Sequence, residues 1–175
     1  AEIAAVDNAW PGRIGYLQPR NVVELGTGQG AATAKMMIAL PVGARLTTIN
    51  YNDGHTFGEQ LGGWKCDPRL HLIGADTIDP DTLDLVPDGI DVLFIDTTHE
   101  AWHVATELRL WQDKLKDGAI VVVDDLDQHD MMAFWNSLPY EKVRDGGQGM
   151  FRYSAGQRYN VFFKRPDRTT YGGSK

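Results

Sequence analysis

Acidic side chains stand at two places in the sequence where a run of apolar residues stops. Asp96 follows the run 90–95, and Asp124 and Asp125 follow the run 119–123. If these runs are neighbouring parallel strands, the three carboxylates meet at one edge of the sheet and repel each other. A hard divalent cation such as Mg²⁺ relieves that repulsion by binding carboxylate oxygens. The pattern therefore predicts a metal site at Asp96, Asp124 and Asp125.

The competing interpretation is that some of these acids cap helices, because acids stabilise the start of a helix. We expect that role for Asp127 and Asp130, which precede or open the next helical segment. For the three acids directly after the apolar runs, we favour the metal site.

A histidine, His99, stands three residues after Asp96. An imidazole titrates near neutrality, so it is suited to take a proton from a hydroxyl group. A zinc site is also open, because residues 99–103 have the H-E-x-x-H spacing in which His99 and His103 of one helix bind zinc. Against zinc, Thr97 and Glu100 fit a capping box that opens a helix.

A glycine-rich turn, residues 24–31, follows the run 21–25 and opens a helix. Glycines there allow a tight turn and let backbone N–H groups approach a ligand closely. Gly26, Gly28 and Ala31 satisfy the dinucleotide fingerprint, so a nicotinamide cofactor stays open.

The same turn resembles the first motif of class I methyltransferases, because an acid stands two residues before the first glycine and the spacing is G-x-G-x-G. The resemblance implies that these residues wrap the methionine and ribose parts of S-adenosylmethionine: Glu24, Gly26, Thr27, Gly28 and Gly30. It also implies ribose contact from Asn50 or Asp53, where the family usually has an acid directly after the second strand. Asp76 is implied at the adenine, and a turn cap is its alternative role.

Residues 96–100 together with Asp124 and Asp125 resemble the metal-dependent sugar O-methyltransferases of macrolide tailoring and the cephalosporin-hydroxylase-like group. This resemblance covers roughly residues 20–165, by organisation more than by identity. It implies magnesium at the acidic positions, His99 as general base, and a hydroxyl of a sugar or natural product as methyl acceptor. Alignment of donor and acceptor and a cation at the acceptor oxygen are the chemistry such a transfer needs.

The elements that must position these residues alternate along the chain. Strands are expected at 21–25, 44–50, 70–73, 90–95 and 119–123, and helices at 31–40, 79–85, 98–116 and 130–138. We therefore predict an α/β fold with a doubly wound, mostly parallel sheet. The resemblance implies that this sheet is seven-stranded and of the Rossmann-like methyltransferase type. Strand-like segments follow at 140–144, 149–154 and 159–164, and Gly156 between the last two predicts a C-terminal antiparallel hairpin.

Length and composition fit one globular domain, since the chain has 175 residues and 42% are hydrophobic. We expect a single methyltransferase domain over 1–175, with a helix and connector in 1–19 and a flexible tail at 166–175. A net charge of −7 argues against nucleic-acid binding. No apolar run approaches the roughly 20 residues that cross a bilayer, and one cysteine without an export signal suits the cytoplasm.

Three functions from other classes remain open on the sequence. They are an NAD-dependent Rossmann oxidoreductase, a zinc hydrolase using His99 and His103, and a cofactor-binding module without catalysis. The sequence does not predict the oligomeric state.

Overall fold

The computed structural model describes residues 14–51 and 58–167. The expected N-terminal helix before residue 14, the ribose candidate Asp53 and most of the expected tail lie outside the described residues. Within them, no helix is long and apolar enough to span a membrane.

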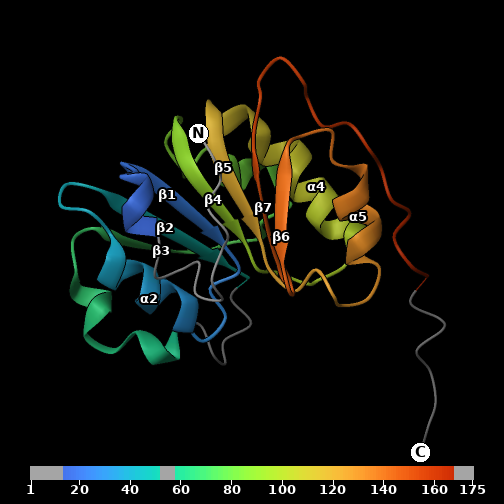
Figure 1. The fold of residues 1–175 in the computed structure, drawn as a ribbon. Coiled ribbons are helices and arrows are strands. Elements are labelled where there is room, and N and C mark those ends of the chain that lie inside the picture. The colour runs from blue at the N-terminus through green and yellow to red at the C-terminus, as the bar shows by residue number, and fades with distance from the viewer. Residues whose placement is uncertain (1–13, 52–57, 168–175) are drawn as a thin grey trace, which may run out of the picture.

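The described chain forms one mixed sheet with the strand order β3-β2-β1-β4-β5-β7-β6 (Figure 1). The strands are β1 (Asn21–Leu25), β2 (Arg45–Asn50), β3 (Leu70–Gly74), β4 (Ile90–Ile95), β5 (Leu115–Val123), β6 (Lys142–Asp145) and β7 (Gln148–Arg152). The first five are parallel, and β7 runs antiparallel to both β5 and β6. The predicted doubly wound, mostly parallel sheet with an antiparallel C-terminal end is confirmed.

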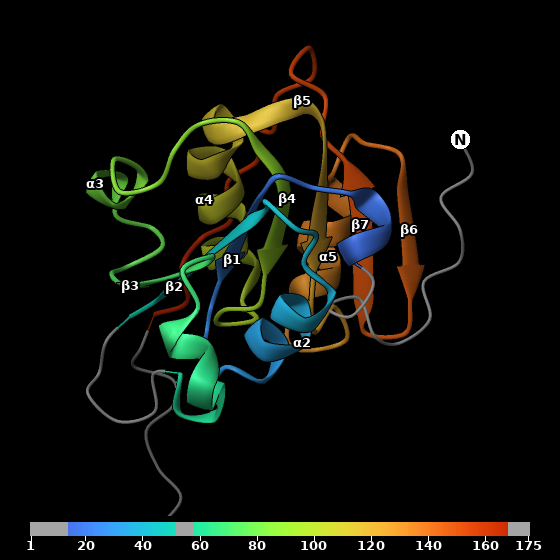
Figure 2. The same cartoon turned by 90° about the vertical axis from the view of Figure 1, so that its left-hand side faces the viewer.

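Helices cover both faces of the sheet, α2 on one and α4 with α5 on the other (Figures 1 and 2). The α-helices are α2 (Ala31–Ala39), α3 (Pro80–Leu83), α4 (Ala101–Trp111) and α5 (Met131–Ser137), and the 3₁₀ helices are η1 (Ile14–Leu17), η2 (Glu59–Cys66) and η3 (Gln112–Lys114). Successive side chains of a strand point to opposite faces. Accordingly Val22 packs into the core under α2, and Val23 packs into the core under α4 and α5.

The long helix expected over 98–116 is shorter, because α4 ends at Trp111 and β5 already begins at Leu115. Its start moves to Ala101, since His99 has a φ of 52° and cannot continue a right-handed helix. The N–H of Ala101 donates to Asp130 Oδ1 at 2.8 Å. Asp130 stands at the N-cap position of α5 without capping it, so this acid tethers the start of α4 instead.

The C-terminal hairpin also lies elsewhere than expected. It joins β6 to β7 through a turn at Gly146, whose φ is 59°, and Gly156 is not its turn. The segment 159–164 forms no strand. The side-chain amide of Gln112 exchanges two hydrogen bonds with the backbone of Tyr159, so this segment packs along α4 rather than pairing with the sheet.

Candidate active site

A cavity of about 280 Å³ lies where the loops after β1, β2, β3 and β4 meet. Strand order reverses between β1 and β4, and in open α/β sheets this switch point is where ligands bind. The wall includes Gly26, Gly28, Asn50, Asp76, Asp96 and His103. Several residues predicted from separate motifs therefore line one space.

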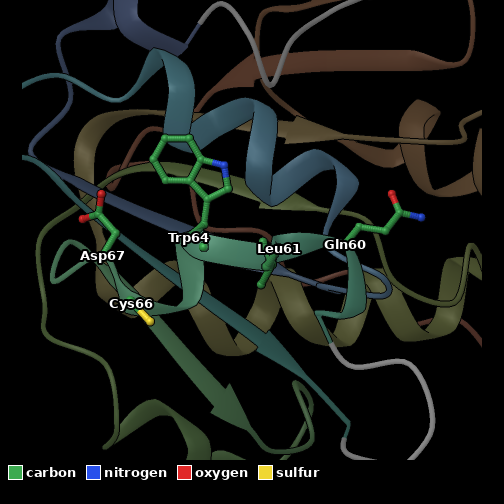
Figure 3. Close-up of a pocket in the computed structure, with 6 residues that line it drawn as sticks. Gln60, Leu61, Trp64, Cys66 and Asp67 are labelled. Atoms are coloured by element: carbon green, nitrogen blue, oxygen red, sulfur yellow. The ribbon is translucent and has the colours of Figure 1, made fainter.

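A larger hollow of about 560 Å³ lies along η2, lined by Gln60, Trp64 and Cys66 among others (Figure 3). Its one carboxylate, Asp67, is held by Arg69 at 2.8 Å, and hydrogen bonds from Arg69 lower the pKa of Asp67 to about 2. This hollow is an open depression on the surface, and its acid is already paired. The smaller cavity at the strand ends is the candidate site.

Two glycines of the turn after β1 are required for different reasons. Gly26 has a φ of 96°, and a Cβ there would collide with the backbone oxygen of Asp96. Gly28 has a φ of 49°, and a Cβ there would meet nothing within 4 Å, because it would enter the cavity. Gly26 thus lets β1 and β4 approach each other, and Gly28 keeps a place for a ligand free. Gly30 is the N-cap of α2 and packs against Leu61.

Glu24 lies beneath the turn and is fully buried rather than part of the cavity wall. Its Oε2 accepts hydrogen bonds from Thr33 and Thr48, both at 2.5 Å, and the hydroxyl of Thr48 also contacts that of Thr27 at 2.5 Å. Burial raises the pKa of Glu24 to about 7, against the lowering effect of the two threonine hydrogen bonds. Glu24 and Thr27 therefore support the turn from below.

Asn50 and Asp76 stand on the cavity wall, and both make local hydrogen bonds. Asn50 Oδ1 accepts from the N–H of Gly28 at 3.1 Å, which fixes the tip of the glycine turn. Asp76 Oδ1 accepts from the N–H of Ile78 at 3.1 Å, so the turn-cap role is present. Contacts of Asn50 with a ribose and of Asp76 with an adenine remain predictions.

At the ends of β4 and β5, the structure brings together Asp96, His99 and Asp125. Nε2 of His99 lies 3.1 Å from Asp96 Oδ1 and 3.2 Å from Asp125 Oδ2. One potential ligand atom from each of the three lies within 4.8 Å of the others. The hydrogen bond to Asp96 raises the pKa of His99 above its usual value, and the charges of Asp125, Asp96 and Asp124 add to this against the opposing effect of burial.

The backbone around this acidic group is strained, because His99 and Asp125 have φ values of 52° and 53°. The left-handed conformation costs an ordinary residue about 1–2 kcal/mol. Such strain persists where the surrounding structure enforces it, and it gathers at functional sites. The same conformation also occurs at Gln18 and His129, outside the acidic group, so it sets the direction of these two side chains and does not by itself identify the site.

Asp124 stays behind this group. Its Oδ1 accepts from the N–H of Asp125 at 2.9 Å. Burial raises the pKa of Asp124, and the charges of Asp96 and Asp125 add to the effect. Of the three acids predicted as metal ligands, the structure thus places Asp96 and Asp125 around His99 and puts Asp124 in support of Asp125.

The zinc arrangement suggested by the H-E-x-x-H spacing is not formed. His99 precedes α4 with a left-handed backbone, while His103 lies within α4 and contacts Glu107 at 3.2 Å. The capping box is wrong as well. Thr97 donates to Glu107 at 2.9 Å, and Glu100 accepts from the indole N–H of Trp102 at 2.6 Å instead of capping the helix.

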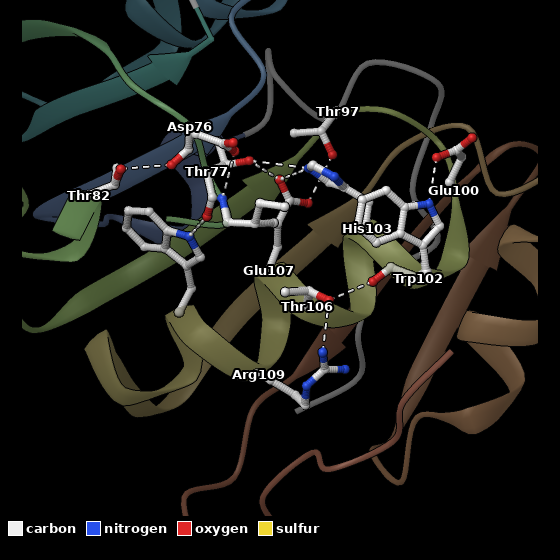
Figure 4. A network of polar contacts seen from close by, with 12 residues as sticks. Asp76, Thr77, Thr82, Thr97, Glu100, Trp102, His103, Thr106, Glu107 and Arg109 are labelled. Carbon is white, nitrogen blue, oxygen red and sulfur yellow. Dashed lines mark hydrogen bonds and ion pairs between the residues drawn. The ribbon is translucent and has the colours of Figure 1, made fainter. Parts of the chain in front are cut away.

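Sequence reasoning missed the buried polar network on the inner face of α4 (Figure 4). It joins Thr77, Thr97, His103 and Glu107 by hydrogen bonds. His103 is only 8% exposed, and Glu107 is completely buried. The available signal was the helical spacing, since Glu107 follows His103 by one turn and neighbours the apolar positions Val104 and Leu108.

A family model described as a methyltransferase domain matches residues 23–126, which span the glycine turn and the acidic group. The chain belongs to this methyltransferase family. The predicted enzyme class, an S-adenosylmethionine-dependent methyltransferase, is confirmed, and the nicotinamide oxidoreductase is set aside. No curated protein matches the sequence.

Solved structures of methyltransferases share the fold at low sequence identity. The O-methyltransferase TomG from Streptomyces achromogenes, involved in tomaymycin synthesis and solved with S-adenosylmethionine, has a TM-score of 0.66 at 19% identity, covering 86% of this chain and 82% of its own. A putative caffeoyl-CoA O-methyltransferase from Staphylococcus aureus has a TM-score of 0.66 at 16% identity, covering 85% of this chain and 84% of its own. An O-methyltransferase from Bacillus cereus, solved with S-adenosylhomocysteine, has a TM-score of 0.65 at 13% identity, covering 87% of this chain and 84% of its own.

Proposed function

We propose that this methyltransferase moves the methyl group of S-adenosylmethionine to a hydroxyl oxygen of a small molecule, with a divalent cation at the acceptor. The observation that carries the proposal is the convergence of the glycine turn and the Asp96–His99–Asp125 group on one edge of the sheet. The O-methyltransferases TomG and the Bacillus cereus enzyme, solved with S-adenosylmethionine and S-adenosylhomocysteine, support the same cofactor and class of acceptor.

The turn fits the cofactor because it keeps a place for a ligand open at Gly28. A side chain there would enter the cavity, while the N–H of Gly28 is oriented by Asn50. Backbone groups at the start of α2 and polar side chains at Asn50 and Asp76 supply the hydrogen-bonding partners that a ribose and a purine need. When bound, the cofactor supplies an activated methyl group on a sulfonium.

The acidic group fits a hard cation through its carboxylates. Asp96 and Asp125 offer oxygen ligands, which Mg²⁺ prefers over imidazole nitrogen, and Mg²⁺ normally completes its shell with water or substrate oxygens. A cation held there would stabilise negative charge on the acceptor oxygen. Asp124 would contribute by holding the backbone of Asp125 in place.

His99 is the proposed general base. Its Nε2 faces two carboxylates and therefore carries hydrogen in the neutral ring, so Nδ1 is the nitrogen that would take the proton of an acceptor hydroxyl, while Asp96 Oδ1 accepts the hydrogen bond from Nε2–H. Asp96 therefore orients the ring and stabilises its charged form, which is the usual role of a carboxylate beside a catalytic histidine. The reaction class thus needs an acceptor whose hydroxyl reaches the edge between β4 and β5.

Calorimetric titration tests the cofactor directly. S-adenosylmethionine and S-adenosylhomocysteine are titrated into metal-free protein, then again with Mg²⁺, with NAD as control. We expect binding of both sulfur ligands and none of NAD. Absence of binding under both conditions would overturn the proposal.

Methyl transfer is then screened on sugars, phenols and other small hydroxyl compounds with Mg²⁺ present. Transfer that disappears in EDTA and returns with Mg²⁺ supports the cation. Full activity in EDTA would remove the cation from the mechanism and leave His99 to act with Asp96 and Asp125 alone.

A further inference from the structure

Glu107 is a fully buried carboxylate directly behind the cavity wall, and the proposed chemistry does not use it. Its Oε1 accepts a hydrogen bond from Thr77 Oγ1 at 2.5 Å and lies 3.2 Å from His103 Nε2. Its Oε2 accepts from Thr97 Oγ1 at 2.9 Å. Figure 4 shows the three side chains gathered around this carboxylate.

These contacts tie together three separate parts of the fold. Thr77 follows β3, Thr97 follows β4, and His103 stands in the first turns of α4. The indole N–H of Trp111 donates to the carbonyl of Thr77 at 2.8 Å and fixes the loop further. A buried charge is costly unless it is paired and hydrogen-bonded. Glu107 meets that condition, and the imidazole of His103 is thereby held in one orientation.

The same contacts decide which nitrogen of His103 carries hydrogen. Thr77 gives its hydroxyl hydrogen to Glu107, so toward His103 it can only accept, at 3.4 Å. Both groups facing Nε2 are then acceptors, and Nε2 carries the hydrogen. In the neutral ring the other nitrogen, Nδ1, is a bare acceptor. Among the described residues no group donates a hydrogen bond to it.

His103 lies on the wall of the same cavity, beside Asp76 and Thr77. The reacting sulfonium must lie near His99 and Asp125, at the ends of β4 and β5. The rest of an extended cofactor then passes over β1 and β2 toward β3, because that is the order of the strands. The loop after β3, which contacts His103, is therefore the place for the base.

We propose that His103 is a specificity-determining residue that reads the adenine base, with Nδ1 accepting a hydrogen bond from its exocyclic amino group. The proposal rests on S-adenosylmethionine as cofactor. Glu107 is the positioning residue, because it holds Nε2–H and leaves Nδ1 for the ligand. A buried pairing of this kind discriminates well, since a base without the amino group leaves the acceptor unpaired.

The test compares two ligands that differ in the base alone. S-adenosylhomocysteine carries the amino group, and S-inosylhomocysteine carries a carbonyl oxygen at that place. Burial lowers the pKa of His103, but Glu107, Asp76 and Glu100 together raise it by more, so the titrations are run at about pH 8.5 to favour the neutral ring. The wild-type protein should bind S-adenosylhomocysteine at least about 10-fold more tightly.

Two variants and one control complete the experiment. In His103→Ala and His103→Phe, the affinity for S-adenosylhomocysteine should fall about 10-fold, while the affinity for S-inosylhomocysteine stays within about 3-fold of wild type. The ratio of the two affinities should therefore come close to one. The phenyl ring keeps the volume of the imidazole but not its hydrogen bond to Glu107, so the folding of both variants is checked by urea unfolding before the titrations. His71→Ala, which removes a histidine of β3 outside the cavity wall, should keep the wild-type ratio.

The outcomes separate this inference from the proposed function. If the wild-type protein binds neither ligand, the cofactor assignment itself fails and this inference falls with it. If it binds both ligands equally, or if the two variants keep the wild-type ratio, His103 does not read the base although the cofactor is right. An equal loss of both ligands in both variants would show a structural role and also overturn the inference.

Discussion

The two ends of the candidate site, the glycine turn and the acidic group, are built by opposite means. At the glycine end, backbone geometry shapes the site, and buried hydroxyls around Glu24 hold it from beneath. At the acidic end, the side chain of His99 contacts those of Asp96 and Asp125, and His99 and Asp125 themselves have a left-handed backbone conformation. The first end is shaped before any ligand arrives. At the second end, the polar groups are hydrogen-bonded to one another, so a ligand that binds there must replace these hydrogen bonds.

The largest effect is expected at the acidic end, from His99→Ala. Loss of a general base should slow methyl transfer by about 10³-fold, while binding of S-adenosylhomocysteine stays within error. Single-turnover assays and calorimetry measure the two quantities. His129→Ala is the matched control, because His129 is also a histidine with positive φ, at 45°, and is outside the acidic group. Equal rates for His99→Ala and the control would contradict the role of His99.

At the glycine end, two alanine substitutions should separate stability from binding. Gly26→Ala should lower the free energy of unfolding by about 3 kcal/mol or more, because the methyl group meets the Asp96 carbonyl in a left-handed backbone. Gly28→Ala should cost about 1–2 kcal/mol for its backbone alone and abolish cofactor binding by entering the cavity. Urea unfolding and calorimetry distinguish the two. Tight binding to the Gly28→Ala protein would show that the cofactor lies elsewhere.

Glu24 predicts how stability depends on pH. Its pKa is about 7 when folded and 4.5 as a free side chain, so between these values the folded state holds a proton that the unfolded state has lost. The contribution is complete below pH 4.5 and is lost as pH rises through 7. Relative to Glu24→Gln, the wild-type protein should lose about 2.5 kcal/mol between pH 5 and 8. The free energy of unfolding of both proteins is measured by urea unfolding at each pH. If it changes with pH by the same amount in both, Glu24 is ionised in the folded protein over this range.

The smallest effect concerns the strain at Asp125. Asp125→Gly should have a free energy of unfolding about 1 kcal/mol higher than that of Asp125→Ala, because glycine adopts positive φ without cost. Urea unfolding of the two variants measures this difference. Both variants lose the carboxylate, so their difference reports the backbone alone. Both should lose Mg²⁺-dependent activity. Equal stability of the two would mean that the left-handed backbone at residue 125 is not strained.

The sequence predicts the glycine end better than the acidic end, for a physical reason. Short-range rules place β1, its three glycines and α2 within a residue of where they lie, because strand period and turn chemistry are local. They also place Asp96 and Asp125 at one edge of the sheet. They do not reveal that Asp124 accepts the N–H of Asp125, since that contact depends on a left-handed backbone at Asp125 that no local sequence pattern fixes.

Long-range partners explain the other differences. The helix predicted over 98–116 has good periodicity, but it begins only where Asp130, 29 residues later, accepts the N–H of Ala101. The strand predicted at 159–164 has strand-like composition, but its backbone is hydrogen-bonded by the side chains of Gln112 and Arg109 instead of by a neighbouring strand. The network around Glu107 joins residues up to 30 apart. Such partners are set by the folded chain and leave no local pattern.

The bond between Gln112 and Tyr159 spans 47 residues of chain and bears on the order of events during synthesis. A ribosome releases α4 well before Tyr159, so the outer side of that helix lacks its partner until nearly the whole described chain has emerged. Glu107 and His103 stand on the opposite side of the same helix. A nascent chain therefore completes the glycine turn early, whereas the hydrogen bonds between Gln112 and Tyr159 form only after Tyr159 has emerged.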